Sequence, residues 1–241
     1  MSGSRFALLA LLLTLVALLH PAGAARAAGF TASTVAELIA AINDANDEGA
    51  NPGGDTITLT ATTFTVTAAD NASSILGDNN AFPVISSDIT ITYAGQGRAT
   101  IQRSGQAAMR FFEVSQGAYF NLENVVLSDG RAQLGGAIYN AGTMGLWNSV
   151  LENNQAVGEA GDDSDIGAPG PGGGGAGMGG AGYNDVTGMA YTDTTPLRAN
   201  SATGGAGGDG HTNDGTVTAI GRDGGGPTGG SGGAAGLNDN V

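Results

Sequence analysis

The sequence repeats itself, and this repeat constrains the fold more than any other feature. Residues 120–127 align with residues 144–151 at an offset of 24, and the alignment extends to Ala132 and Ala156. Two further pairs of segments align at offsets of 44 and 46, namely 135–143 with 179–187 and 154–161 with 200–207. A fixed period is typical of chains in which one short unit stacks on the next, because a single unit cannot bury its own apolar side.

The residues around these repeats predict strands and turns. Apolar residues alternate with Thr, or stand in short runs bounded by Gly, Asn or Ser, over 55–60, 63–67, 88–92, 110–114, 119–122 and 125–127. We therefore predict an all-β fold, a right-handed parallel β-helix. An antiparallel sandwich is the alternative, because it also explains many short strands, but it does not explain a fixed offset with identities at equivalent corners.

The repeat also predicts which residues stack. Leu122 with Leu146, and Leu127 with Leu151, are expected to form inward-facing ladders. The same offset of 24 places Asn124 and Asn148 one above the other. We expect them at a tight corner, because Asn tolerates a left-handed backbone and its side-chain amide can form a hydrogen bond with its neighbour.

A short helix is expected before the first strand. Thr34 and Glu37 have the spacing of a capping box, and apolar residues follow at helical spacing through Ile42, which predicts an amphipathic helix over 34–46. The Asn, Asp, Gly and Pro residues of 46–54 end it. We expect this N-terminal helix to cap the stack, whose open end has unpaired backbone groups.

The first residues have the pattern of a secretory signal. Arg5 precedes an apolar run over 6–19, and two A-x-A cleavage sites follow, at 22–24 and at 25–27. The run is too short for the roughly 20 residues that cross a bilayer. We therefore predict a signal peptide over 1–27, no membrane span after its removal, and a secreted or cell-surface protein, associated with the outer membrane of a bacterium.

Glycine marks the C-terminal third, since 28 of the 44 glycines follow residue 157. The expected organisation is a capping helix and linker over 28–54, a parallel β-helix over 55–208 with a Gly-rich insertion around 158–182, and an irregular, low-complexity Gly-rich tail over 209–241.

Together these segments resemble a known family. The stretch 33–43, the strand after Gly54, the segment 82–86 and above all Gly-Gly-Ala-Ile at 135–138 are similar to secreted bacterial right-handed parallel β-helix proteins with polymorphic-outer-membrane-protein-type (GGAI) repeats. The second element of such repeats reads Leu151-Glu-Asn-Asn here, with Leu in place of Phe. The resemblance implies a surface or secreted scaffold of adhesin type, with no reaction attached.

Composition excludes several functions. The chain has no Cys and no Lys, two His and a net charge of −14, so it has neither a disulfide framework nor a basic surface for nucleic acid. The Gly-rich run 172–180 is no phosphate loop, because that motif needs Lys.

Two acidic Gly-rich loops are candidates for Ca²⁺ sites. The run 162–165 contains three Asp but lacks the closing Glu of an EF-hand, and 204–212 resembles a calcium-binding nonapeptide with His211 in place of its large apolar residue. We assign no residue a catalytic, cofactor or metal role, and Ca²⁺ at these loops stays as an alternative.

A glycan-acting enzyme, either a polysaccharide hydrolase or a lyase, is the functional alternative. It would need acids grouped in one groove, and the candidates are Asp88, Glu113, Glu123 and Asp129, with Arg110 or Arg131 on one outward face beside Glu113 and Glu123. Trp147 and Tyr139, next to the Asn-rich corner, could stack on a sugar ring, but aromatic residues beside such a corner also pack locally. The expected function is a non-enzymatic exported scaffold whose partners are surface glycans or other cell-surface proteins.

Overall fold

The computed structural model describes residues 27–73, 75–162 and 174–207 in full, and residues 209–211 and 217–220 as backbone. It is mostly β structure, with parallel sheets and one helix. Parallel pairing excludes the antiparallel sandwich.

Two large sheets carry most of the strands. The six-stranded sheet contains, in spatial order, β1 (Gly29–Ala32), β2 (Asp55–Leu59), β6 (Asp88–Tyr93), β9 (Tyr119–Glu123), β13 (Thr143–Trp147) and β17 (Met189–Asp193). The five-stranded sheet contains β18 (Leu197–Arg198), β14 (Val150–Glu152), β10 (Val125–Ser128), β7 (Ala99–Arg103) and β3 (Thr63–Val66).

Two smaller parallel sheets complete the body. The β8 sheet contains β8 (Phe112–Val114), β12 (Ile138–Asn140) and β16 (Gly182–Asn184), and the β11 sheet contains β11 (Arg131–Ala132), β15 (Gln155–Val157) and β19 (Ser201–Thr203). From β9 onward the chain visits the sheets in a constant order: six-stranded, five-stranded, β11 sheet, β8 sheet. We call each such passage a circuit, so that β9–β12 is followed by β13–β16 and by the last circuit, β17–β19.

The predicted pairings within these sheets are confirmed. Leu122 is the partner of Leu146, and Leu127 of Leu151, and all four side chains are buried. Phe112 lies between Phe82 and Phe120, with ring centroids 5.2 and 4.9 Å away. Inward-facing ladders of apolar side chains therefore form one continuous core.

Asparagine ladders hold the corners of the circuits. Asn124 and Asn148 both have positive φ, and the Asn148 amide donates to Asn124 Oδ1 at 2.7 Å, as the repeat predicted. Two more ladders join residues from the longer offsets: Asn140 with Asn184, and Asn154 with Asn200. These amide contacts satisfy side chains where strands end, and they fix the alignment of neighbouring circuits.

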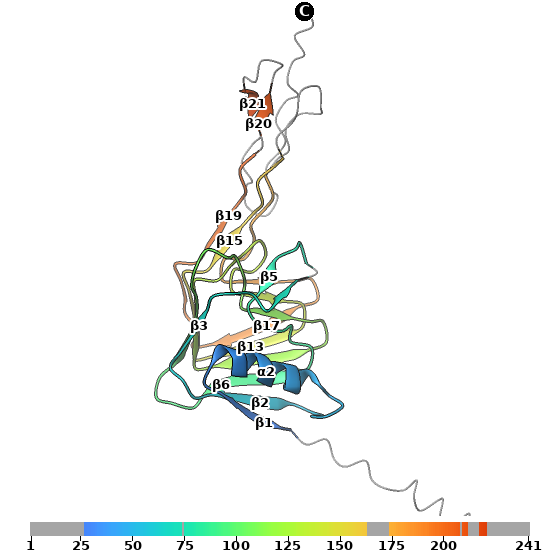
Figure 1. Ribbon diagram of the computed structural model, residues 1–241, viewed down its shortest axis with the longest axis vertical. Coiled ribbons are helices and arrows are strands. Elements are labelled where there is room, and N and C mark those ends of the chain that lie inside the picture. The colour runs from blue at the N-terminus through green and yellow to red at the C-terminus, as the bar shows by residue number, and fades with distance from the viewer. Residues whose placement is uncertain (1–26, 74, 163–173, 208, 212–216, 221–241) are drawn as a thin grey trace, which may run out of the picture.

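The N-terminal helix α2 (Val35–Asn46) forms where it was predicted. Thr34 Oγ1 accepts from the Glu37 amide, and the Glu37 carboxylate accepts from the amide and hydroxyl of Ser33, both at 2.7 Å. Its buried face, which includes Leu38 and Ile42, packs over the first strands of the six-stranded sheet (Figure 1).

The edge of β2 is covered by a strand instead of this helix. The short strand β1 pairs with β2 in parallel, from Gly29 opposite Thr56 to Ala32 opposite Leu59. The sequence pattern did not predict β1, because four residues are too few to show a strand period. The helix thus covers the apolar interior, and β1 satisfies the backbone groups of the edge.

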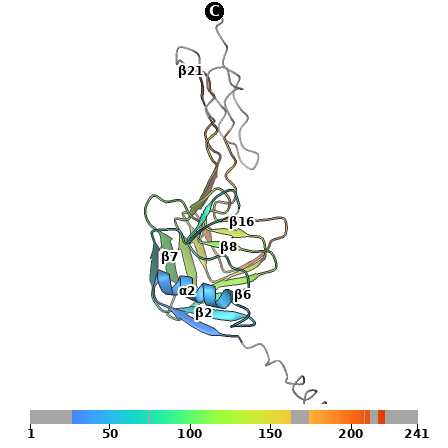
Figure 2. The same cartoon turned by 45° about the vertical axis from the view of Figure 1, so that its right-hand side comes forward.

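A narrow stem rises from the body where the last circuits leave it (Figures 1 and 2). Its described segments are 157–162, 174–177 and 203–207, and three hydrogen bonds link them in a ring: Gly158 N to Thr203 O, Gly205 N to Gly175 O, and Gly175 N to Glu159 O. Further out lie β20 (Asp209–His211) and β21 (Val217–Ile220), which pair in antiparallel fashion. This pair is regular structure in a segment that we expected to be an irregular tail. A hairpin of β4 (Asn71–Ala72) and β5 (Asn79–Asn80) completes the strands.

Candidate functional site

The four carboxylates considered for catalysis lie on separate parts of the body. Asp88 begins β6, Glu123 ends β9, Asp129 follows β10, and Glu113 lies in β8. A grouped-carboxylate groove is therefore not formed by these residues. The expected outward face of Glu113, Glu123 and Arg110 is also wrong, because Glu113 and Arg110 are buried in the β8 region while Glu123 lies on the six-stranded sheet.

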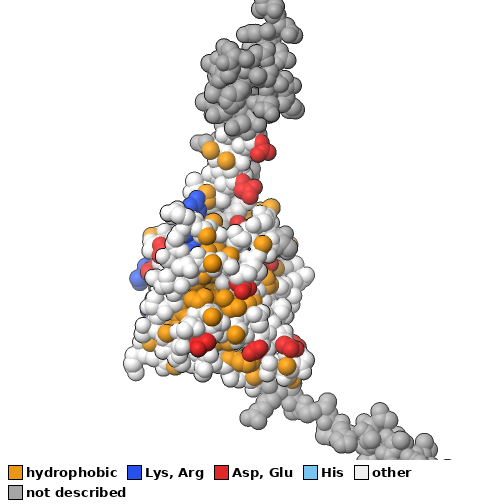
Figure 3. Space-filling view, in the orientation of Figure 1, with side chains coloured by type: hydrophobic (Ala, Val, Ile, Leu, Met, Phe, Trp, Pro, Cys, Tyr) orange, Lys and Arg blue, Asp and Glu red, His pale blue; other side chains and the backbone are white. Residues whose placement is uncertain are grey.

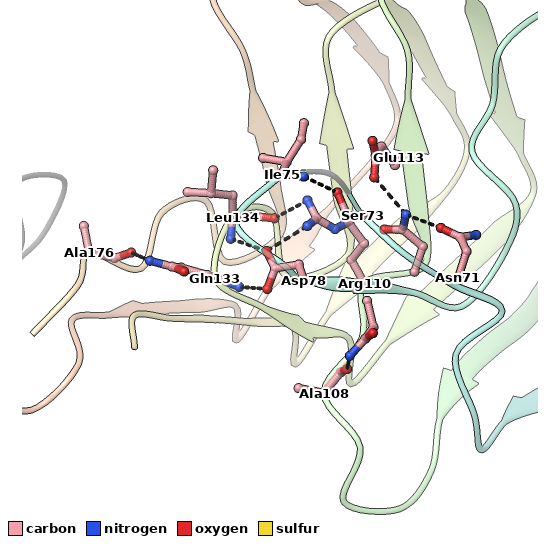
Figure 4. Close-up of polar contacts among 12 residues, drawn as sticks. Asn71, Ser73, Ile75, Asp78, Ala108, Arg110, Glu113, Gln133, Leu134 and Ala176 are labelled. Atoms are coloured by element: carbon pink, nitrogen blue, oxygen red, sulfur yellow. Dashed lines mark hydrogen bonds and ion pairs between the residues drawn. The ribbon is translucent and has the colours of Figure 1, made fainter. Parts of the chain in front are cut away.

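Instead, Arg110 is the centre of a buried polar cluster (Figure 4). Its guanidinium contacts Asp78 Oδ2 at 2.7 Å and donates to Leu134 O at 2.9 Å. The Asp78 carboxylate also accepts from the amides of Gln133 and Leu134. The charges are thus paired and hydrogen-bonded, which is the condition under which a buried ion pair persists.

Neighbouring side chains extend this cluster. Asn80 donates to Glu113 Oε2 at 2.8 Å and to Asn71 Oδ1 at 2.9 Å. The Tyr139 ring lies under the guanidinium, with Arg110 Cζ 5.4 Å from its centroid. Burial lowers the pKa of Arg110, while Asp78 and Glu113 oppose this shift. The cluster ties the β4–β5 hairpin to the β8 sheet and offers no exposed nucleophile or base.

A surface cavity of about 400 Å³ lies beside this cluster. Asp78 forms part of its wall, together with Arg131, Gln133 and Glu159. Because Asp78 is already held by Arg110 and two amides, its carboxylate is committed to the fold.

The outward side of the six-stranded sheet carries the exposed aromatic side chains. Tyr119, Trp147 and Tyr191 come from β9, β13 and β17, and they are 56, 39 and 51% exposed. The register places Tyr119 opposite Thr143, and Gly145 between Asn121 and Tyr191. Since Met144 and Leu146 face inward and are buried, the alternating residues of β13 and their partners face outward.

The indole of Trp147 lies against the sheet. A Cβ on Gly145 would stand 2.7 Å from Trp147 Nε1 and 3.2 Å from Cε2, so the ring fills the place that a side chain would take. The indole N–H donates to Asn121 Oδ1 at 3.3 Å. Gly145, whose strand partner on β17 is Tyr191, therefore leaves room for the ring against the sheet.

Acidic side chains flank these rings. Glu123 and Asp193 are the strand partners of Trp147 on either side. We call the set Tyr119, Asn121, Glu123, Trp147, Tyr191 and Asp193 the aromatic face. Flat rings beside carboxylate and amide groups can pack on the C–H side of a sugar ring and accept from its hydroxyl groups.

The sequence identified this face in part. Trp147 is at the surface as expected, but Tyr139 is buried: its ring stacks on Tyr183, and its hydroxyl donates to Asp185 Oδ2 at 2.7 Å. Burial and this hydrogen bond raise the pKa of the Tyr139 hydroxyl. Tyr119 and Tyr191 were missed, although the offsets of 24 and 46 place them on the strands that flank Trp147.

The two loops considered for the Ca²⁺ alternative are only partly within the structure. Asp162 is described, whereas residues 163–165 lie outside the described residues, and of His211 only the backbone is described. Among the described residues, no group of three or more His, Cys, Asp or Glu is arranged to hold a metal ion. In the same part of the chain, no helix is long and apolar enough to cross a membrane.

Comparison adds no relative. No protein-family model, curated protein or solved structure matches this chain. The aromatic face and the arrangement of the sheets are therefore the features that indicate a function.

Proposed function

We propose that this chain is an exported, non-enzymatic scaffold, a right-handed parallel β-helix of the type with polymorphic-outer-membrane-protein repeats, that binds neutral glycans through its aromatic face. The constant order in which the chain visits its parallel sheets supports the β-helix. The signal-like first residues support export.

One observation carries the binding function: three aromatic rings are exposed on one sheet face whose other strands present Thr, Asn and acidic groups. Exposed apolar side chains that gather on one surface can mark an interaction site. The ring of Trp147 lies against Gly145 and is held by its hydrogen bond to Asn121, so little ordering is needed on binding.

The charge of the face selects the kind of glycan. Glu123 and Asp193 flank Trp147, and acidic residues outnumber Arg throughout the chain. Acidic side chains also outnumber basic ones on the side shown in Figure 3. A polysaccharide of uronic acids or sulfated sugars would be repelled, whereas the hydroxyl groups of a neutral chain can donate to these carboxylates.

Trp147 is the only Trp of the chain, so its fluorescence reports on this face alone. Titration with a panel of neutral polysaccharides should shift its emission, and acidic polysaccharides of matched length should not. Tyr191→Ala should weaken binding by about tenfold, as loss of one aromatic contact does. Val186→Ala, a change at a fully exposed residue outside the face, is the matched control.

The same samples test the alternative. New reducing or unsaturated ends released from any polysaccharide would show a glycan-acting enzyme and contradict the scaffold. Absence of binding to every neutral polysaccharide, measured both by fluorescence and by co-sedimentation, would refute the glycan-binding function.

A further inference from the structure

Asp55, the first residue of β2, is a buried carboxylate that has no cationic partner among the described residues. Asp55 is 1% exposed. Oδ1 accepts from the amide nitrogen of Ala28 at 2.6 Å, and Oδ2 has no hydrogen-bond partner among the described residues. A charged oxygen buried in this way is costly unless a positive group approaches it.

The surroundings of Asp55 are acidic. Burial, together with the carboxylates of Glu48 and Asp55, raises the pKa of Asp88. A Cβ on Gly54 would stand 2.9 Å from Asp88 Oδ2, so that carboxylate lies close to the start of β2. Within the described part of the chain, the pair Arg110–Asp78 is the only ion pair, so no described Arg neutralises this corner.

The position of the Ala28 nitrogen is set by strand pairing. Ala28 O accepts from the Thr56 amide at 3.0 Å, and Gly29 is the partner of Thr56 in the register of β1 with β2. The position of the Ala28 nitrogen therefore depends on the pairing of residues from 28 onward. Ala25-Arg26-Ala27, the A-x-A site that ends the expected signal peptide, directly precedes it.

We propose that cleavage of the Ala27–Ala28 bond turns this nitrogen into an α-ammonium group that forms a buried ion pair with Asp55. A signal-peptidase-class protease adds one water across the peptide bond, which leaves a carboxylate on Ala27 and an amino group on Ala28. That amino group takes up a proton from solvent at neutral pH. The peptide nitrogen has one hydrogen to donate, whereas the ammonium has three, enough for Oδ1, Oδ2 and a further acceptor.

Processing thereby completes the first edge of the six-stranded sheet. The inference rests on the proposed export of the chain. The proposal also selects between the two A-x-A sites. Cleavage after Ala24 would leave Ala25-Arg26-Ala27 attached, and the ammonium would then be on Ala25, three residues before the Ala28 nitrogen that contacts Asp55. The ion pair forms only when the mature chain begins at Ala28.

The chain contains no Lys, so the α-amino group is its only primary amine and can be modified selectively. The full chain should be exported from a bacterial host, and the product analysed by N-terminal sequencing, with Ala28 expected first. Acetylation by an N-hydroxysuccinimide ester should then be about tenfold slower on the folded product than in urea, because the paired ammonium must dissociate and lose its proton before it reacts. Equal rates would overturn the proposal.

Two variants of the full chain separate pairing from folding. Asp55→Asn should make native acetylation as fast as in urea, while Asp129→Asn, a change at a corner where Asn is equally suited, should leave the protection intact. Acetylation of the wild-type product, performed in urea and followed by refolding, should lower its melting temperature by several degrees and should not change that of Asp55→Asn. Equal melting temperatures for the acetylated and the free-amine forms of the wild-type product would refute the ion pair.

These outcomes are separable from the proposed function. Export with a first residue of Ala25 would overturn the ion pair and leave the exported scaffold in place. A chain that stays uncleaved in the cytoplasm would overturn export, while glycan titration of Trp147 would still test the binding function.

Discussion

The middle of the body and its last circuit follow the same plan with different side chains. Along three inward ladders the residues lose bulk from β12–β13 to β16–β17: Ile138 gives way to Gly182, Met144 to Ala190, and Leu146 to Thr192. In the middle, buried ladders hold the circuits together. In the last circuit the strand β17 is exposed throughout, and a small apolar cavity of about 150 Å³ opens beside it.

The loss of side-chain bulk continues in the stem, where the segments contact each other through their backbones. A Cβ on Gly158 would stand 2.0 Å from Gly175 O, and one on Gly174 would stand 2.0 Å from Gly205 O. Close approach of this kind needs glycine, because any larger residue would push the segments apart. One chain can thus stack its units either by apolar ladders, as in the body, or by contact between glycine and backbone, as in the stem. We therefore expect substitutions to affect the body and the stem differently.

A large loss of stability is expected at the polar cluster of the body. Arg110→Ala leaves the Asp78 carboxylate, whose side chain is only 12% exposed, without its charge partner and should lower the free energy of unfolding by up to about 3 kcal/mol. Denaturant unfolding followed by circular dichroism measures this. Arg131→Ala, at an exposed residue of the nearby cavity, is the control and should change stability by about 0.5 kcal/mol or less.

One Leu ladder allows the middle and the last circuit to be compared directly. Leu127→Ala, with partners on both sides, should cost about 2–5 kcal/mol. Leu197→Ala, two strands away in the same ladder but 61% exposed, should cost about 0.5 kcal/mol or less. Equal losses for the two variants, measured by denaturant unfolding, would show that the last circuit is part of the core.

Glycine substitutions test the stem. A Cβ on Gly177 would stand 2.2 Å from Thr203 O and 2.6 Å from Ala156 O, so Gly177→Ala should cost about 1–3 kcal/mol through displaced backbone. Gly182→Ala is the control, because its Cβ would meet Ile138 O at an ordinary 3.6 Å. Hydrogen exchange of the Gly158 amide, which donates to Thr203 O, should be faster in the first variant and unchanged in the second.

The smallest effect concerns pH at the start of the body. Burial, followed by the charges of Glu48 and Asp55, raises the pKa of Asp88, so the protonated form favours the folded state. The contribution of this group to stability is therefore greatest below its unfolded pKa and is lost as pH rises through the folded pKa. Asp88→Asn in the unprocessed chain should raise the melting temperature at pH 7 and have no effect at pH 3. A lower melting temperature at pH 7 would mean that Asp88 is stabilised as an anion.

Several features could be predicted because they depend on short-range patterns. The offset of 24 was enough to pair Leu122 with Leu146 and Asn124 with Asn148, since stacked units repeat the same inward and corner positions. The capping box was enough to place helix α2. The chain's only Trp could be placed next to the corner residue Asn148, but the contact of its ring with the sheet could not, because this contact depends on Gly145 and Asn121 together.

The cluster of Arg110 shows why the rest could not be predicted. Asp78, Arg110 and Leu134 are far apart in sequence, and no local pattern distinguishes a buried Arg from an exposed one. The same holds for Tyr139: the sequence left stacking on a sugar ring and local packing both open, and the structure shows that it packs on Tyr183 and Arg110.

By itself, the sequence determined the period, the inward and corner residues of each unit, the N-terminal helix and the acidic character of the surface, because all of these follow from residue type and spacing along the chain. Only the tertiary structure decided which side of the stack carries the aromatic face, that Asp55 is buried beside the Ala28 nitrogen, and that glycine segments separated by tens of residues form a stem. Those features depend on how segments meet across the fold, and the free energy of such contacts comes from burial and close approach, which no local pattern records.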